Sequence, residues 1–386
     1  MLNTQHSTLK TPYALYLHVP FCLSKCPYCD FYSGRETALI PAYVAAVKEE
    51  LTALKRAGAF ADETLFSRPL RSVYFGGGTP SLLPAGELGS ILDTVRGRYA
   101  LQTDAEITVE VNPTLKNKEA WFSSVAKAGV NRVSVGLQSA VDAERKALGR
   151  RGTVEDVKET VFAAKGAGIR NISVDLMLGI PGQTPETLRA SMDFVLSLGV
   201  THVSAYILKI EPGTVFDKRK EKLDLPDEDA VADLYLRMCE YLKAQGMRHY
   251  EISNFCFGNA VGRHNLSYWQ CGEYLGVGPA AHSFLNGRRF YYERDLSGFI
   301  AGAAPVDDGP GGDRDEVFLL ALRTDTGVCL PEFEQRFSFT LSPAFFRTVE
   351  TYEAHGLVAY HAGRLCLTAQ GFLLSNSIIS ALLAEF

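Results

Sequence analysis

Apolar and polar positions alternate between two periods through the first two-thirds of the chain. In residues 126–136, 165–175 and 196–206, an amphipathic helical stretch ends in glycine and a short β-branched strand follows at once. Glycine suits the left-handed position that terminates many helices. Strands that alternate with helices are joined by parallel crossovers. The pattern therefore predicts an α/β fold built on a parallel sheet.

Earlier segments continue the same rhythm. They predict strands at 14–19, 71–75 and 106–111 and helices at 41–57 and 85–98, and a last helix of this region at 228–245. The total is six or seven strands, too few for a closed eight-stranded barrel. A partial, open (β/α)6 barrel fits this count better.

The C-terminal part has a different pattern. Residues 305–315 are rich in Pro, Gly and Asp, which predicts a linker. Helices are expected at 316–322, 330–336 and 343–355, a hairpin at 357–360 and 364–367, and a final helix at 369–383. Helices followed by a small hairpin are typical of a winged helix. The helix at 343–355 has two glutamates and few basic residues, so we do not expect DNA binding.

Composition limits the range of functions. With 386 residues, of which 46% are hydrophobic, the chain can form a full core and two domains. A net charge of −5 without a basic stripe disfavours a nucleic-acid partner. The first ten residues lack the apolar core of a signal peptide, and no run is long enough to span a bilayer. We therefore expect a cytoplasmic protein.

The division into domains follows from these patterns. We expect a flexible N-terminus at 1–12, a barrel at 13–250, a connecting region at 251–304 and a C-terminal winged-helix-like domain at 305–386.

The densest chemical signal is the C-x3-C-x2-C run formed by Cys22, Cys26 and Cys29. Three thiolates can hold three irons of a 4Fe-4S cube and leave the fourth iron open to a ligand. A disulfide framework would need an oxidising compartment, which nothing in the sequence indicates. Zinc stays an alternative, because His18 lies four residues before Cys22. The other five cysteines are scattered, and most of them are expected to be buried free thiols.

Glycines and polar residues mark the carboxyl ends of the predicted strands. Gly76–Gly78 follow an apolar strand, and their backbone can approach a ligand closely or simply form a tight turn. Glu110, Gln138 and Asp175 fall where function gathers in parallel sheets, and Arg150 lies in a loop. They could bond a ribose or adenine, or serve as ordinary caps and loop ion pairs.

Together these motifs resemble one branch of the radical S-adenosylmethionine (SAM) superfamily. The cysteine run stands between Tyr16-Leu-His-Val-Pro-Phe and Asp30-Phe31, and the match runs from about Tyr13 to the C-terminus. The branch contains oxygen-independent coproporphyrinogen III oxidases and heme chaperones. The resemblance implies that the three cysteines bind a 4Fe-4S cluster whose open iron is chelated by SAM. The residues it implies as SAM contacts are Tyr16, Tyr28, Gly77, Gly78, Thr79, Glu110, Gln138, Arg150 and Asp175, some of which belong to a second SAM site in the oxidase.

Two features favour the chaperones within this branch. The oxidase carries a further cysteine two residues after the third ligand, where this chain has Phe31. The oxidase also has a long N-terminal extension, whereas 21 residues precede Cys22 here.

A second motif points the same way. His264-Asn265-Leu-Ser-Tyr268-Trp269 resembles the HNxxYW motif that is linked to heme binding in the chaperones. Imidazole is an iron ligand, and aromatic rings stack on a porphyrin. Without the resemblance, a hydrogen-bonded core histidine is the simpler interpretation. Cys271 and His282 are lesser candidates for a second axial ligand.

The resemblance therefore implies a heme chaperone that binds heme and a SAM-ligated 4Fe-4S cluster and passes heme to apo-proteins such as respiratory cytochromes. One alternative is the oxidase, in which a 5′-deoxyadenosyl radical starts an oxidative decarboxylation. Another is a zinc-stapled binding module. Whether the protein is an enzyme stays open, with oxidase activity disfavoured. An electron donor is expected, while a homodimer and peripheral membrane contact stay open.

Overall fold

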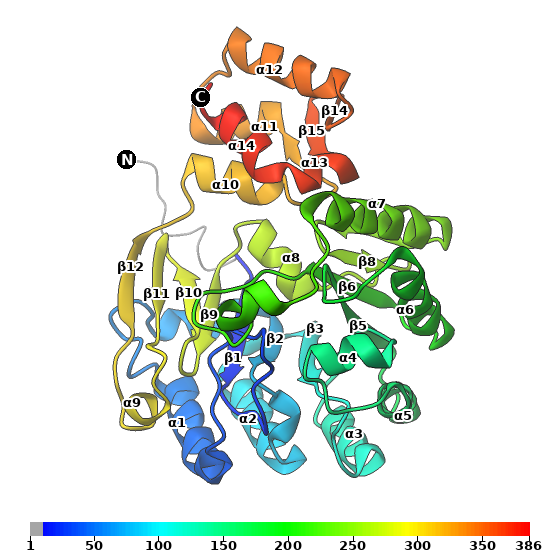
Figure 1. The fold of residues 1–386 in the computed structure, drawn as a ribbon. Coiled ribbons are helices and arrows are strands. Elements are labelled where there is room, and N and C mark those ends of the chain that lie inside the picture. Colours follow the sequence, from blue (N-terminus) through cyan, green and yellow to red (C-terminus); the bar gives the residue numbers. More distant parts are fainter. Residues whose placement is uncertain (1–10) are drawn as a thin grey trace. The chain divides into compact units, whose positions relative to one another are not determined.

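A computed structural model describes residues 11–386, so the predicted flexible N-terminus lies outside the described residues except for Thr11 and Pro12. The chain divides into two compact units, each made of two segments. The first unit holds the described residues up to Pro226 together with Gly272–Gly311. The second holds Asp227–Cys271 and Gly312–Phe386. Figure 1 shows the elements of both units in sequence colours.

The first unit is built on parallel strands that neighbour one another in chain order. These are β1 (Tyr13–Val19), β2 (Pro69–Gly77), β3 (Ala100–Val111), β4 (Arg132–Gln138), β5 (Asn171–Leu178) and β6 (His202–Ile207). A linear order β1-β2-β3-β4-β5-β6 means that the barrel formed by the described residues is open. The predicted partial (β/α)6 barrel is confirmed.

Helices connect these strands and lie outside them (Figure 1). They are α1 (Ile40–Ala53), α2 (Ala85–Arg98), α3 (Lys118–Lys127), α4 (Asp142–Ala147), α5 (Val154–Gly166) and α6 (Pro185–Ser197). Thr153 forms a capping box at the start of α5, and Thr184 forms one at the start of α6. Gly129, Gly168 and Gly199 have φ of 94°, 90° and 61°, which confirms the predicted left-handed helix ends.

Side chains alternate between apolar and polar through β4 and through the second half of β3. In β4, Val133, Val135 and Leu137 are fully buried, while Arg132, Ser134 and Gln138 share the opposite face. The apolar face packs against the helices, which leaves a polar face toward the inside of the barrel. Parallel strands covered on both sides are usually apolar on both faces. This exception indicates an interior built for polar contacts.

Strand register aligns these polar positions into rows across the sheet. Glu110 lies opposite Ser134, Ser134 opposite Ser173, and Ser173 opposite His202. The hydroxyl of Ser173 lies 2.7 Å from Nδ1 of His202. This bond satisfies two buried polar side chains of the row.

The sheet extends beyond the predicted strands on the other side of β1. There, β9 (Tyr274–Val277) pairs parallel to β1, and three antiparallel strands follow, with a short helix between the last two. They are β10 (His282–Leu285), β11 (Arg288–Tyr291), α9 (Leu296–Ile300) and β12 (Val306–Pro310). The prediction of a linker at 305–315 was therefore wrong at 306–310. A short, charged edge strand gives little apolar signal in the sequence.

The second unit combines helices with two small sets of strands. Its elements are α7 (Glu228–Ala244), β7 (Arg248–Glu251), β8 (Asn254–Cys256), α8 (Arg263–Trp269), α10 (Arg314–Ala321), β13 (Val328–Cys329), α11 (Leu330–Phe337), α12 (Pro343–Ala354), β14 (Val358–His361), β15 (Arg364–Leu367), α13 (Ala369–Leu373) and α14 (Ser375–Leu383). The antiparallel order β13-β15-β14 beside α10–α12 is the predicted winged-helix arrangement. The final predicted helix is broken at Leu374 into α13 and α14. No helix among residues 11–386 has the length and apolar character to cross a bilayer.

A buried carboxylate ties the two segments of the first unit together. Glu50, at the end of α1, is fully buried and accepts hydrogen bonds from the backbone N–H groups of Arg56 and Ala57 at 2.8 and 2.9 Å. It also lies 3.3 Å from the Arg56 guanidinium and accepts from the Tyr292 hydroxyl at 3.2 Å. Tyr292 comes from the second segment of this unit, so Glu50 links both segments.

This arrangement predicts a large difference between two neighbouring glutamates. Glu50→Ala removes the buried one of the two carboxylates that pair with Arg56 and leaves the backbone N–H groups of Arg56 and Ala57 without their acceptor. It should lower the free energy of unfolding by about 3–5 kcal/mol. Glu49 pairs with the same Arg56 at 2.9 Å but is half exposed, so Glu49→Ala should cost less than about 1 kcal/mol. Urea unfolding followed by circular dichroism measures both. Equal losses for the two variants would contradict the assignment.

Candidate functional site

The three motif cysteines lie on a loop that follows β1. Its ends are clamped by backbone hydrogen bonds, Cys22 N–H to Gly34 O and Gly34 N–H to Pro20 O, both 2.8 Å. Cys29 N–H donates to Cys26 O at 3.1 Å, which makes a tight turn between these two ligands. All three are free thiols and partly exposed. The loop is thus held as a unit with its thiols accessible.

Polar groups from two other loops reach these thiols. Thr79 Oγ1 lies 3.4 Å from Cys22 Sγ, and Arg150 Nη1 lies 3.9 Å from Cys26 Sγ. Burial raises the pKa of Cys29, and the neighbouring motif thiols add to the rise. Within residues 11–386, no three His, Cys, Asp or Glu side chains surround a single ion position. A 4Fe-4S cube does not need such convergence, because each cysteine binds a different iron. The donor set fits this cluster.

His18, the fourth ligand of the zinc alternative, is already engaged. Its Nε2 lies 2.9 Å from the Tyr32 carbonyl oxygen, and its Nδ1 lies 3.2 Å from the Tyr16 hydroxyl. The ring is buried, and this burial lowers its pKa to about 4. Both nitrogens of this neutral imidazole are hydrogen-bonded to protein groups, so neither is available as a zinc ligand. This argues against zinc at the cysteine loop.

The glycine run at the end of β2 passes directly against the cysteine loop. A Cβ atom on Gly77 would lie 2.7 Å from the His18 ring, and one on Gly78 would lie 2.7 Å from the Phe21 carbonyl oxygen. Gly77 also has φ of 109°, where other residues are strained. Gly78 N–H donates to Val19 O at 2.9 Å. Only glycine allows this approach, which places Thr79 beside Cys22.

Two carboxylates lie on the barrel strands, Glu110 near the end of β3 and Asp175 in the middle of β5 rather than at the predicted strand end. Glu110 accepts a hydrogen bond from the Tyr74 hydroxyl at 2.9 Å and another from Gly77 N–H. Burial raises the pKa of Glu110 to about 7. Asp175 accepts a hydrogen bond from Ser134 at 2.8 Å, and burial raises its pKa as well. Many protein atoms surround both side chains, but part of each stays accessible to solvent. This is expected for groups that face the open interior of the barrel.

Gln138 and Arg150 show signs of a binding position. Gln138 has φ of 68°, and its Oε1 is buried without a hydrogen-bond partner among the described residues. Backbone strain and an orphaned acceptor in the same residue are typical of a ligand site. Arg150 Nη2 donates to Gly136 O at 2.7 Å, which holds the guanidinium next to Gln138.

Tyr16 and Tyr28 occupy different environments. Tyr16 stacks on Tyr74 with ring centroids 6.2 Å apart, next to Glu110. Tyr28 packs against an apolar cluster that includes Phe216, with ring centroids 6.2 Å apart. Burial raises the pKa of Tyr28, and Cys26 and Arg150 lie close enough to affect it too, so both tyrosines border the predicted site.

A cavity of about 500 Å³ adjoins the cysteine loop in the first unit. Three predicted site residues, Cys26, Thr79 and Arg150, line it. Lys116, Arg151 and Trp121 also line it, and sequence reasoning missed them. Lys116 and Arg151 make no ion pair among the described residues. Lys116 and Arg151 belong to no motif and lie in different loops, so the sequence alone does not indicate that they border one cavity.

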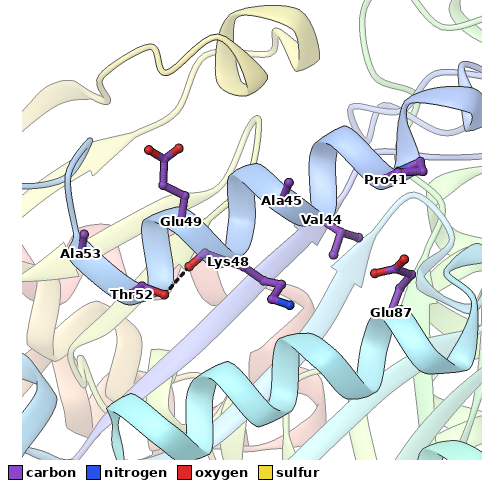
Figure 2. A pocket seen from close by; sticks show the side chains of 8 residues that line it. All are labelled: Pro41, Val44, Ala45, Lys48, Glu49, Thr52, Ala53 and Glu87. Carbon is purple, nitrogen blue, oxygen red and sulfur yellow. Dashed lines mark hydrogen bonds between the residues drawn. The ribbon is translucent and has the colours of Figure 1, made fainter.

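A second hollow, of about 550 Å³, lies between α1 and α2 (Figure 2). Its lining residues are Pro41, Val44, Ala45, Lys48, Glu49, Thr52, Ala53 and Glu87. It contains no predicted site residue, and the Thr52 hydroxyl bonds back to the Lys48 carbonyl at 2.7 Å. We assign it no role in the site.

The predicted heme motif lies on α8 in the second unit. His264 is buried, and its Nε2 lies 2.7 Å from the Tyr268 hydroxyl one turn later. The two rings meet edge to face with centroids 5.1 Å apart. Asn265, Tyr268 and Trp269 are partly exposed. The structure therefore brings the four motif residues together on one short helix, with the imidazole held by an internal bond.

The lesser axial candidates belong to different units. Cys271 follows α8 with φ of 51° and is partly exposed. His282, on β10 of the first unit, stacks on Tyr291 with centroids 5.2 Å apart.

Comparisons with known proteins agree with this arrangement of motifs. Residues 16–195 match the Radical SAM superfamily, and residues 314–374 match the HemN C-terminal domain. The heme chaperone HemW of Mycobacterium tuberculosis is 35% identical over 384 residues, which cover 96% of this chain and 95% of that protein. The chain belongs to the HemW family.

Other relatives support this membership. HemW of Escherichia coli is 38% identical over 75% of this chain and 76% of its own length. Mitochondrial radical S-adenosyl methionine domain-containing protein 1 of Bos taurus is 38% identical over 96% of this chain and 87% of its own. The solved structure of coproporphyrinogen III oxidase (HemN) from E. coli matches with a TM-score of 0.81 at 21% identity, covering 97% of this chain and 90% of that one. The last comparison concerns the fold alone.

The glycine contact predicts a specific failure in this HemW family member. Gly78→Ala should displace the cysteine loop and reduce the iron bound after anaerobic reconstitution from about four atoms per chain to fewer than about one. Gly86→Ala is the control, because a Cβ there meets nothing within 4 Å. Iron and sulfide analysis measures both. Normal iron content in Gly78→Ala would show that the loop tolerates the shift.

The pKa of Glu110 predicts how SAM binding depends on pH. Ionised Glu110 can accept a hydrogen bond from a SAM hydroxyl, and this form predominates above pH 7 and is lost below it. The affinity for SAM should therefore fall by up to about tenfold from pH 8 to pH 6. Glu110→Gln should bind more weakly and lose this dependence. Glu119→Gln, on the exposed start of α3, should keep it. Anaerobic calorimetry with cluster-loaded protein measures the three profiles.

Proposed function

We propose that this protein is a heme chaperone that binds heme and a SAM-ligated 4Fe-4S cluster and passes heme to apo-proteins such as respiratory cytochromes. The observation that carries the proposal is near full-length similarity to HemW proteins together with an intact motif on α8. The protein is cytoplasmic in this proposal, with an electron donor as a further partner and no nucleic acid.

Cys22, Cys26 and Cys29 hold the cluster in this proposal, and the clamp at Gly34 fixes their loop. When bound, the cluster provides a reducing electron and an open iron for SAM. The backbone at Gly77 and Gly78 and the Thr79 side chain border the methionine end. Glu110 and Gln138 present acceptors near the ends of β3 and β4, and Asp175 presents one from the middle of β5. Tyr16 packs beside Tyr74, the partner of Glu110.

Heme is the cargo and binds at the α8 motif in this proposal. His264 must release its bond to the Tyr268 hydroxyl before its imidazole can reach iron, because Nε2 is occupied in the structure. Tyr268 and Trp269 are partly exposed and offer rings for the porphyrin face. A histidine held by an internal bond exchanges one partner for another, which suits transient binding more than permanent retention.

The domain boundaries stay part of the proposal: a barrel at 13–250, a connecting region at 251–304 and a C-terminal domain at 305–386. The match of residues 314–374 to the HemN C-terminal domain supports the last of these.

One specific observation favours a second function, coproporphyrinogen oxidation: the similarity in fold to the HemN structure. Against it stands Phe31, which occupies the position of the oxidase's extra cysteine and is 68% exposed. An apolar ring at this place cannot replace a thiol.

The chaperone proposal predicts heme binding that depends on His264. Titration of heme into cluster-loaded protein should give a saturable Soret change, and His264→Ala should weaken binding by at least about tenfold as an iron ligand is lost. His355→Ala, an exposed histidine of the same unit, is the control. Delivery to an apo-cytochrome should follow the same order. Equal binding by both variants would remove His264 from the site.

The oxidase is tested separately. Anaerobic incubation with coproporphyrinogen III, SAM and a reductant should give no protoporphyrinogen above the level of a Cys26→Ala variant. Formation of one equivalent or more per chain would establish the oxidase instead.

A further inference from the structure

Trp269, the last residue of the α8 motif, has a cation over its ring. The guanidinium carbon of Arg323 lies 6.0 Å from the centroid of the Trp269 ring, at the outer limit of a cation–π contact. Arg323 follows α10, in the other segment of the second unit, so the chain fold alone brings it to this motif. Burial raises the pKa of the Glu251 carboxyl to about 7, and the nearby Trp269 side chain lowers it in part.

The charge of Arg323 is not neutralised by any carboxylate among the described residues. Its only side-chain hydrogen bond is from Nη2 to the amide oxygen Oδ1 of Asn376, at 2.7 Å. The side chain is about half buried, and this burial lowers its pKa. The group nevertheless stays charged, since arginine does not lose its proton in proteins. A partly buried cation with spare donors is suited to an anionic ligand.

The position of this guanidinium is fixed by the backbone around it. The Arg323 carbonyl accepts a hydrogen bond from Ile252 N–H at 3.0 Å, and Thr324 bridges to Glu251. The strand end at β7 is therefore tied to the end of α10. Hydrogen bonds therefore hold both the backbone and the side chain of Arg323. They fix the orientation of the remaining guanidinium N–H groups beside Trp269.

We propose that Arg323 binds a propionate carboxylate of the heme that stacks on the α8 motif, an inference that rests on the proposed function. A porphyrin with propionates joins an apolar plane to two carboxylates at one edge. Trp269 offers a surface for the plane, and Arg323 offers a planar pair of donors that matches a carboxylate. The subsite would select porphyrins that carry free carboxylates over neutral ones.

A purely structural role for Arg323 makes a different prediction. If the guanidinium only covers Trp269 and links to Asn376, its removal should weaken the binding of every porphyrin alike. If it binds a propionate, its removal should matter only when that carboxylate is present. Hemin and hemin dimethyl ester differ in this feature and share the macrocycle and iron.

The test is a set of Soret titrations with both porphyrins against the full-length, cluster-loaded protein. We expect wild type to bind hemin about ten- to hundredfold more tightly than the dimethyl ester, the effect of one charge-assisted hydrogen bond. Arg323→Ala and Arg323→Gln should lose that preference while binding the ester within about twofold of wild type. Arg323→Gln keeps a planar side chain over Trp269, which separates loss of charge from loss of packing.

Arg336→Ala is the matched control. Arg336 also lies over an aromatic ring of the same unit, at 5.0 Å, but this ring is Phe337 of α11 and not a residue of the motif. It should keep the preference for hemin. Thermal melts of each variant check that the second unit stays folded.

The outcomes separate this inference from the proposal beneath it. Saturable, His264-dependent binding of hemin with an unchanged preference in Arg323→Gln overturns the subsite and leaves the chaperone proposal standing. Equal weakening of both porphyrins in the arginine variants also overturns the subsite, in favour of packing. Absence of saturable binding in wild type overturns the proposed function and the subsite together.

Discussion

The close approach between the end of β2 and the cysteine loop is the constraint on which the site depends. A Cβ at Gly77 or Gly78 would meet His18 or Phe21 at 2.7 Å, so the two segments can pass only where side chains are absent. This contact holds the loop with Cys22 beside Thr79 and directs Gly77 N–H at Glu110. The cluster ligands and the strand-end carboxylate are therefore positioned by one backbone contact rather than by separate devices.

The polar interior of the barrel follows from strand alternation and has an electrostatic consequence. Serines beside Asp175 and a tyrosine beside Glu110 satisfy these carboxyl groups without supplying a full positive charge. Desolvation therefore dominates and raises both pKa values. A buried carboxylate without a full positive charge beside it is stabilised when a ligand hydroxyl donates to it, which suits the binding of hydroxyl groups of a nucleoside.

In the α8 motif, by contrast, two polar side chains are hydrogen-bonded to each other. His264 and Tyr268 bond to each other, and Trp269 lies beside Arg323 and near Glu251. In our proposal, binding of a porphyrin replaces the internal bond and gives the Arg323 guanidinium an anionic partner. When the heme leaves, His264 and Tyr268 can bond to each other again, so neither is left without a hydrogen-bond partner. Delivery of heme to another protein requires such reversible binding.

The sequence by itself determined the parallel α/β architecture, the cysteine run, the α8 motif and the glycines at 76–78 that let β2 pass close to the cysteine loop. Each is a local pattern: alternation within a strand, spacing within a loop, or neighbours on a helical turn. Only the tertiary structure decided the four strands beyond β1, the packing of Tyr28 in an apolar cluster, and the loss of His18 as a metal ligand to bonds with Tyr16 and Tyr32. It also decided that Arg323 lies over Trp269. These features join residues distant along the chain, and a side chain's partners depend on which surfaces the fold brings together, which no local pattern encodes.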